Sequence, residues 1–195
     1  MATAIHILPV GPGVSITLLD EVAAALAKIF RLSCHVEERS RVDAAFALDA
    51  RRNQYHATSI LRRLRDVEPD EQVRAIGITR LDLFVPILTF VFGEAELGGR
   101  CAVVSLHRLD ERYYGLPARD ELLRERLVKE AVHELGHTFG LRHCDNWRCV
   151  MASSHAVDRL DIKERDFCSL CRNDLVAMNR RGPTAPAYRE TPPLL

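Results

Sequence analysis

Apolar residues along the chain follow two spacings, which predict strands and helices in alternation. The apolar run at residues 4–10 shows little periodicity and ends in a Pro/Gly turn, which predicts a buried strand. Residues 15–30 repeat apolar side chains at intervals of three and four, the spacing of an amphipathic helix. A second strand is predicted at residues 33–37. This strand–helix–strand order favours a crossover unit and parallel pairing within one sheet.

The same alternation continues to the end of the predicted domain. Residues 93–99 are rich in glycine and are predicted to form a loop. The other elements predicted are a helix at 56–67, strands at 73–79, 87–92 and 101–106, a long helix at 120–139 and a last helix at 161–180. The pattern therefore predicts an α/β fold with one sizeable core.

Composition restricts the classes of protein that fit. Lys plus Arg and Asp plus Glu number 27 each, so the net charge is zero and gives no argument for binding to nucleic acid or to a membrane. No segment approaches the ~18 apolar residues of a membrane span, and the N-terminal residues lack the basic region of a signal peptide. We therefore expect a soluble, cytoplasmic protein, in which six cysteines are thiols or metal ligands rather than a disulfide framework.

The segment HELGHTFGLRHC carries the main candidate chemistry. His133 and His137 lie four apart, so on a helix their imidazoles share one face and can bind one metal ion. Glu134 is rotated off that line and can reach a metal-bound water without binding the metal. Gly140 is placed to end the helix, which lets the chain turn back and supply His143 as a third ligand. Three protein ligands leave a fourth position for water, which is typical of a catalytic zinc.

Two further features refine this site. Met151 follows at the place expected for the turn that lies beneath the zinc in metzincins. Tyr113 and Tyr114 precede the site helix, where they could help to bind an oxyanion or could simply pack or cap a loop. The ligand set predicts hydrolysis of peptide bonds through a zinc-bound water, with Glu134 as general base.

A second metal centre is predicted from the cysteines. Cys144, Cys149, Cys168 and Cys171 form two close pairs, the pattern of a closed tetrahedral zinc–thiolate site. A redox CxxC would explain only the second pair, and four unrelated buried thiols are the remaining alternative. In an extended segment the neighbours His143 and Cys144 point to opposite sides. The second zinc is therefore expected to hold together the third-ligand loop, the Met-turn and the C-terminal helix.

The motif HExxHxxGxxHC, followed by CxM and CxxC, resembles the archaemetzincins, and so do upstream stretches such as RRNQYHATSILRRL. The resemblance implies an α/β (α+β), metzincin-like fold over residues 1–181, in which helices flank a mixed, twisted sheet. It divides the domain into an upper part of about 1–140 and a small lower part of about 141–181, which carries the four-cysteine zinc site. Residues 182–195 form a proline-rich tail that is predicted to be poorly ordered.

The resemblance also implies a zinc metallopeptidase with two zinc ions per chain, one catalytic and one structural, and a peptide or protein substrate. In metzincins an edge strand above the cleft pairs with the substrate, and residues 87–92 or 101–106 are the candidates here. The rival interpretation is a zinc-stabilised protein- or peptide-binding module with little or no proteolytic activity, which leaves Glu134 without a role. The sequence leaves open the substrate, aminopeptidase against endopeptidase action, the oligomeric state, the native metal at the histidines and the access to the cleft.

Overall fold

The central feature of the fold is a five-stranded sheet with the order β2-β1-β5-β8-β7. The computed structural model describes residues 1–181, so the prediction of a poorly ordered tail lies outside the described residues. The strands are β1 (Ala4–Val10), β2 (Ser33–Val36), β5 (Val73–Thr79), β7 (Gly93–Ala95) and β8 (Cys101–Ser105). The first four in spatial order are parallel, and β7 pairs antiparallel with β8 at the edge. The predicted mixed sheet is thus confirmed.

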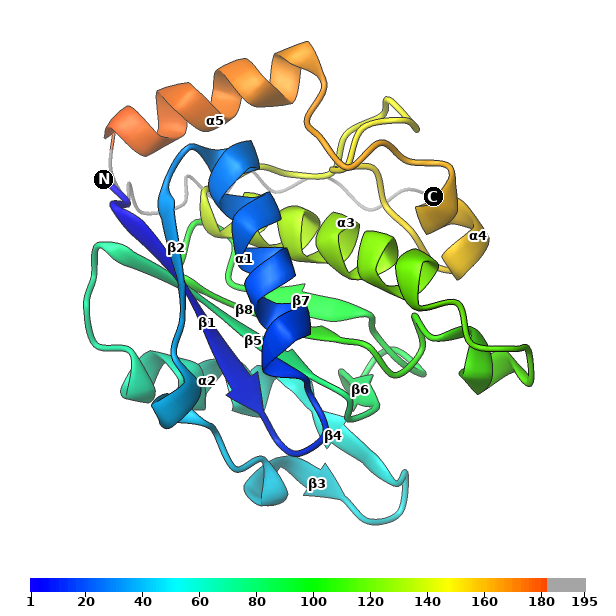
Figure 1. Cartoon of the computed structure of the whole chain (residues 1–195). Coiled ribbons are helices and arrows are strands. Elements are labelled where there is room, and N and C mark those ends of the chain that lie inside the picture. The colour runs from blue at the N-terminus through cyan, green and yellow to red at the C-terminus, as the bar shows by residue number, and fades with distance from the viewer. Residues whose placement is uncertain (182–195) are drawn as a thin grey trace.

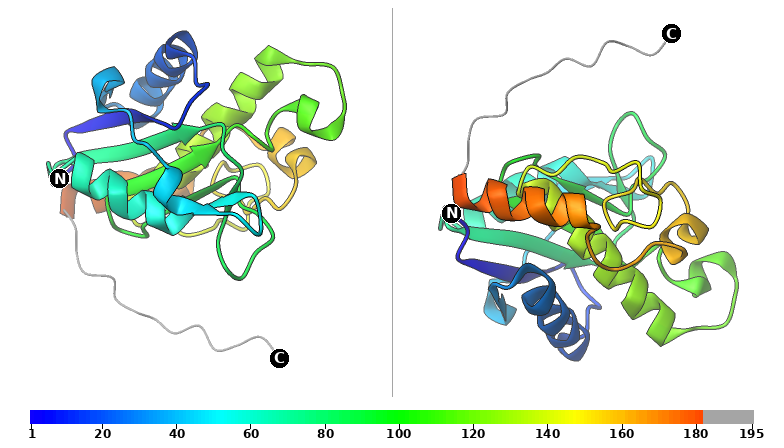
Figure 2. Two further views of the ribbon diagram at one scale, coloured as in Figure 1. Left: turned by 90° about the horizontal axis from the view of Figure 1, so that it is seen from below. Right: turned by 90° about the horizontal axis from the view of Figure 1, so that it is seen from above.

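Helices cover both faces of this sheet (Figure 1 and Figure 2). Helices α1 (Ile16–Phe30) and α3 (Asp120–Thr138) pack on one face, and α2 (Ala57–Val67) packs on the other. Because side chains alternate along a strand, each strand feeds both apolar layers. Ile76 and Ile78 of β5 join the layer under α1 and α3, whereas Ala75 joins the layer under α2.

Several smaller elements lie outside the five-stranded sheet and its three covering helices. Strands β3 (Leu48–Asp49), β4 (Gln54–His56) and β6 (Leu83–Phe84) form a separate small sheet. Short 3-10 turns occur at Glu38–Ser40, Ala45–Ala47 and Glu111–Tyr114. After α3 the chain forms α4 (Val157–Asp161) and α5 (Ser169–Arg181). Asn179 on α5 accepts a hydrogen bond from the Ala2 amide at 2.9 Å, which brings the two ends of the domain together.

The predicted strand at residues 87–92 is wrong. Pro86 is followed by an exposed turn, in which Ile87 is 90% exposed. The Arg52 guanidinium donates hydrogen bonds to the carbonyl oxygens of Leu88 and Thr89 at 2.9 and 3.0 Å. These two oxygens therefore bond to a side chain rather than to a neighbouring strand. The edge strand forms instead within the segment that was predicted to be a glycine-rich loop.

The predicted last helix at residues 161–180 is wrong in its first half. Residues between α4 and α5 leave the helical path and bond to the segment that contains Cys149. The amide of Glu164 donates to the Arg148 carbonyl at 2.8 Å, and the amide of Val150 donates to the Asp166 carbonyl at 3.2 Å. These contacts replace the helical hydrogen bonds that the apolar spacing had suggested. The division of the domain near residue 140 stays a prediction.

Among residues 1–181, no helix combines the length and apolar character that crossing a membrane requires.

Candidate active site and metal centres

Helix α3 presents two imidazoles from its last turns. The ring centroids of His133 and His137 lie 4.6 Å apart, as expected for residues one turn apart on one face. His133 Nδ1 lies 2.8 Å from the Val150 carbonyl, and His137 Nδ1 lies 2.7 Å from the Leu141 carbonyl. A carbonyl oxygen only accepts, so each Nδ1 carries the proton. Both Nε2 atoms therefore offer lone pairs.

The two Nε2 atoms face each other at a separation that suits two ligands of one metal ion. The two Nε2 atoms are 3.1 Å apart, and two nitrogen ligands of a tetrahedral zinc lie about 3.3 Å apart. Two unprotonated nitrogens at this distance repel each other unless a cation lies between them. His143 joins them, since the candidate ligand atoms of the three histidines all lie within 4.8 Å of one another. The predicted histidine triad is thus brought together, and its donor set fits zinc.

Burial keeps these imidazoles in the form that binds metal. It lowers the pKa of His133 well below its ordinary value and also lowers the pKa of His137 and His143. Neutral imidazole is the ligand form, so at neutral pH no proton has to be removed from the triad.

The end of α3 fixes the path to the third histidine. Gly140 has φ +97°, the left-handed conformation that glycine adopts without strain. Its amide donates to the His137 carbonyl at 2.9 Å, and the Leu141 amide donates to the Gly136 carbonyl at 3.1 Å. This pair of bonds is a Schellman cap. The predicted end of the helix at Gly140 is confirmed, and the same turn supplies the carbonyl that orients His137.

Met151 lies directly against α3 beneath the histidines. A Cβ atom at Gly136 would fall 2.5 Å from the Met151 sulfur, so only glycine allows this approach. Gly136 lies between His133 and His137 on the helix, and Met151 is completely buried. The structure thus packs Met151 against the helix turn between the two histidines, and its role beneath a metal stays a prediction.

Glu134 lies beside the edge strand rather than among the histidine nitrogens. A Cβ at Gly93 of β7 would meet Glu134 Cγ at 2.6 Å, so the strand passes directly over this side chain. Neither predicted edge strand is correct. Residues 86–89 form a turn and Val91 makes only an isolated bridge to Leu83, while residues 101–105 lie inside the sheet between β5 and β7.

Two buried residues that the sequence did not single out contact this centre. Glu130 lies one turn before Glu134 and interacts with it, and Lys163 Nζ donates to the Val150 carbonyl at 3.3 Å. That carbonyl also accepts from His133. Burial raises the pKa of Glu134 well above its ordinary value and raises the pKa of Glu130 to about 7, while the nearby Lys163 opposes the shift in both. The i,i+4 spacing could have revealed Glu130, but the wrong helix prediction concealed Lys163.

Lys163 should balance the two carboxylates, which gives a test. Lys163→Met leaves Glu130 and Glu134 side by side without a buried cation, and we expect kcat to fall roughly 10- to 100-fold. Adding Glu130→Gln removes one carboxylate charge at nearly constant side-chain shape, so the double variant should recover most of the loss. Steady-state kinetics of the four proteins in this cycle measures the coupling. Equal loss in the single and double variants would mean that Lys163 acts only through the Val150 carbonyl.

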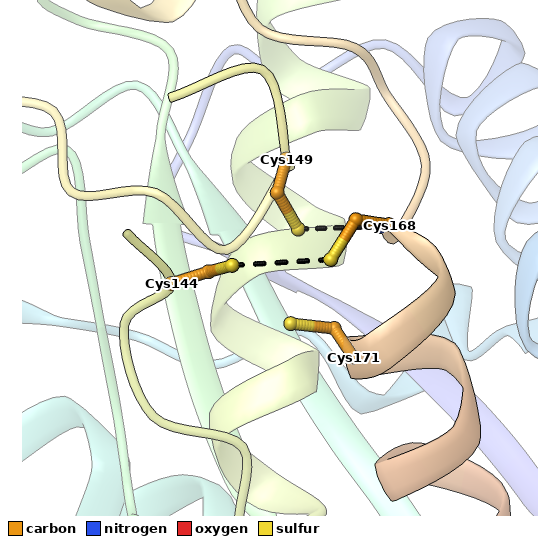
Figure 3. A group of neighbouring side chains, drawn as sticks. All are labelled: Cys144, Cys149, Cys168 and Cys171. Atoms are coloured by element: carbon orange, nitrogen blue, oxygen red, sulfur yellow. Dashed lines mark hydrogen bonds between the residues drawn. The ribbon is translucent and has the colours of Figure 1, made fainter. Parts of the chain in front are cut away.

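The four predicted cysteines come together at one point (Figure 3). Cys144 and Cys149 come from the loops after α3, and Cys168 and Cys171 come from the start of α5. The sulfurs of Cys144 and Cys168 are 3.9 Å apart, close to the about 3.8 Å between thiolates on a tetrahedral zinc. All four are free thiols. A redox pair would need only Cys168 and Cys171, so the gathering of all four supports a metal site.

Backbone groups prepare this cluster to bind metal and connect it to the histidines. A hydrogen bond from the backbone of Cys171 lowers the pKa of Cys168 to about 7, and the Cys168 amide donates to the Cys149 sulfur at 3.3 Å. The amide of Cys144 donates to the carbonyl of Met151 at 3.0 Å. The cysteine cluster thus joins the chain beside His143 to the segment beneath the triad.

Tyr113 and Tyr114 are exposed in the 3-10 turn before α3 and make local contacts there, and their oxyanion role stays a prediction. The Tyr114 hydroxyl donates to the Arg108 carbonyl at 2.9 Å. The ring of Tyr113 packs edge-on against His107 at 5.1 Å.

Comparison with known proteins identifies the family. The sequence model for peptidase family M54 matches residues 20–177. An archaemetzincin of Pyrococcus furiosus is 37% identical over 186 residues, which cover 93% of this chain and 97% of that relative. The chain belongs to the archaemetzincins, peptidase family M54. It is therefore a zinc metallopeptidase that acts on peptides or proteins.

Solved structures agree with this membership. The crystal structure of an archaemetzincin from Methanopyrus kandleri superposes with a TM-score of 0.79 at 33% identity, covering 92% of this chain and 97% of that one. The archaemetzincin from Archaeoglobus fulgidus gives a TM-score of 0.76 at 40% identity, with coverages of 88% and 99%. The predicted metzincin-like α/β fold is thus confirmed.

Proposed function

We propose that this peptidase cleaves its substrate at a zinc ion held by His133, His137 and His143, with Glu134 as general base. We further propose that Cys144, Cys149, Cys168 and Cys171 hold a second, structural zinc. The observation that carries the catalytic assignment is the pair of facing, unprotonated Nε2 atoms, with a buried carboxylate on the next residue of the same helix.

The chemistry divides between the metal and Glu134. Zinc, when bound, acidifies a water molecule and polarises the carbonyl of the scissile bond. The Glu134 carboxylate accepts a proton from the attacking water and then donates it to the departing amide nitrogen. Burial raises the pKa of this carboxyl, which makes it a better base and lets it keep the proton between the two transfers.

Strand β7 is suited to align the substrate. It ends the order of the sheet, so one row of its backbone groups is unpaired within that sheet. An extended peptide can add to such an edge by backbone hydrogen bonds. Because Gly93 lies against Glu134, a peptide on β7 would pass the general base.

The segment after Gly140 forms the other part of the proposed site. Met151 provides an apolar floor beneath the triad without binding the metal, and residues 141–181 form the lower part of the domain. The four gathered thiols favour a reducing compartment, and we propose that the protein works in the cytoplasm.

Metal analysis tests the two-site assignment. Zinc per chain should fall from two in the wild type to one in His137→Ala, because removal of one of three ligands empties the histidine site. His35→Ala, which changes an exposed imidazole on β2, serves as the matched control and should keep both ions. Elemental analysis after zinc loading and gel filtration gives the count. A count that His137→Ala leaves unchanged would contradict the histidine site.

The same proteins should be assayed against a peptide library. Hydrolysis by the wild type and by His35→Ala, with none by His137→Ala, would connect the histidine site to turnover.

A further inference from the structure

Arg74, on β5, is an unusual buried arginine. Among residues 1–181 the buried arginines are Arg74, Arg100 and Arg126, which are 6%, 8% and 2% exposed. Arginine is seldom buried to this extent unless its charge is paired. The three side chains can therefore be compared by the partners that they have.

The guanidinium groups of Arg126 and Arg100 both have hydrogen-bond acceptors within the protein. Arg126 binds both carboxylate oxygens of Asp161 at 2.7 Å, and it also bonds to Glu111 and to the Leu109 carbonyl. Arg100 donates to the backbone carbonyls of Arg65, Glu68 and Asp70. Both guanidinium groups thus have their acceptors built into the fold.

Arg74 lacks such partners. Its Nε is buried and has no hydrogen-bond acceptor in the described part of the chain. Its guanidinium instead lies over the ring of Phe139, with the central carbon 5.0 Å from the ring centroid. Burial lowers its pKa, and the nearby charge of Arg100 lowers it further. A buried, unpaired cation costs stability, so this residue needs another explanation than support of the fold.

A cavity of about 330 Å³ adjoins this side chain. Its size is at the lower end of the range for ligand pockets. Seven residues from the end of α2, the start of β5 and the loop between β7 and β8 line it: Arg65, Glu71, Arg74, Glu96, Gly98, Gly99 and Arg100. Three arginines from three separate segments thus line one small space.

The two carboxylates in the wall do not neutralise Arg74. Glu96 pairs with Arg65 and accepts from the Arg100 amide at 3.3 Å. Glu71 is exposed and lies 3.5 Å from Arg100 Nε. Each acidic group is thus paired with another arginine. Glu71 also acts on Arg74 and partly opposes the lowering of its pKa, but three arginines against two carboxylates leave one positive charge in excess.

We propose that this cavity binds a phosphate group, with Arg74 as its principal ligand. A tetrahedral oxyanion presents oxygens in several directions, so it can accept hydrogen bonds from Arg74 while it lies within the positive charge of Arg65 and Arg100, whereas a planar carboxylate suits mainly one guanidinium group. Its charge would balance the surplus at Arg74, and its oxygens would supply the acceptor that Nε lacks.

The location connects the cavity to the active-site helix. The Gly98 amide, in the cavity wall, donates to the carbonyl of His137 at 2.8 Å. Phe139, under the Arg74 guanidinium, is the C-cap residue that follows α3. A bound phosphate therefore stabilises the loop that follows β7, together with the end of the helix that carries His137.

Thermal unfolding at increasing inorganic phosphate tests the site, with chloride used to keep the ionic strength constant. Arg74→Met keeps an unbranched side chain on Phe139 but removes the charge. Arg63→Met, at an exposed position on α2, removes the same charge outside the cavity. Above its dissociation constant, each tenfold increase in phosphate should raise Tm by about 3–5 °C in the wild type and in Arg63→Met. Arg74→Met should show no rise.

Without phosphate, the variant is not expected to be less stable than the wild type. Arg74→Met should unfold at the same temperature as the wild type or higher, because it removes an uncompensated buried charge. A lower Tm would show that the guanidinium is already satisfied and would overturn the proposal. So would a phosphate response that is absent from the wild type or equal in all three proteins, since phosphate would then act elsewhere. A larger response to succinate than to phosphate would overturn the choice of a tetrahedral anion.

Glycerol phosphate, titrated in parallel, identifies the form of the ligand. A matching response that Arg74→Met abolishes would show that the cavity takes a phosphoester as well as the free ion. The absence of a response to glycerol phosphate would show that the cavity takes only the free ion. The phosphate site is supported in both cases, provided that inorganic phosphate itself binds through Arg74.

Discussion

Glu134→Gln is expected to lower kcat by about 10³-fold or more and to leave both metal sites filled. Gln has nearly the same shape but cannot take a proton from water or return one to the departing nitrogen. His133 and His137 keep their carbonyl partners, because neither of these bonds involves Glu134. The decisive comparison is peptide hydrolysis together with zinc content.

Glu121→Gln is the matched control, since Glu121 lies at the exposed start of the same helix. It should retain full activity. Turnover by Glu134→Gln at the wild-type rate would refute the assignment of the general base. A loss of zinc from the histidine site would instead show that Glu134 contributes to metal binding.

Cys168→Ser is expected to remove the structural zinc and to reduce occupancy of the histidine site as well. The reason is the backbone between the clusters. Cys144 follows His143 and donates its amide to the Met151 carbonyl, while the Val150 carbonyl next to Cys149 orients His133. Loss of the structural ion should also lower Tm by roughly 10 °C or more, because structural zinc contributes directly to folding.

Cys34→Ser is a suitable control, because Cys34 is a partly buried thiol on β2 outside the cluster. It should keep both metals and lose little stability. Zinc analysis and thermal unfolding distinguish the cases. Full zinc at the histidines of Cys168→Ser would show that the two centres are independent.

The sequence predicted the elements whose signals are local. Helix α3 was predicted within one residue of its observed end, because the Gly140 signal and the histidine spacing agree with the apolar stripe. The ligand groups could be predicted for the same reason, since spacing on one helix turn, or in a close cysteine pair, determines proximity. Helix α2 was predicted from its apolar periodicity, and the parallel strands were predicted from their continuous apolar runs.

The failures share a cause, which is competition from distant partners. Residues 87–92 carry a strand-like composition, but Arg52 takes the carbonyl groups of Leu88 and Thr89. Residues 162–168 carry a helical spacing, but the segment around Cys149 takes their hydrogen bonds. Lys163 was missed for the same reason, since its partners lie on α3 and before Met151. No local pattern encodes such contacts.

The cap at the end of α3 has a consequence for how the metal centre moves. The turn that stops the helix at Gly140 also supplies the Leu141 carbonyl that orients His137. Helix ends ordinarily fray, opening and closing much faster than the whole domain unfolds. Here an opened end would misdirect the second imidazole and displace the third. Fraying of this terminus and release of the ion are therefore one event, and an ion bound at the triad makes the last turn of α3 one of its most persistent.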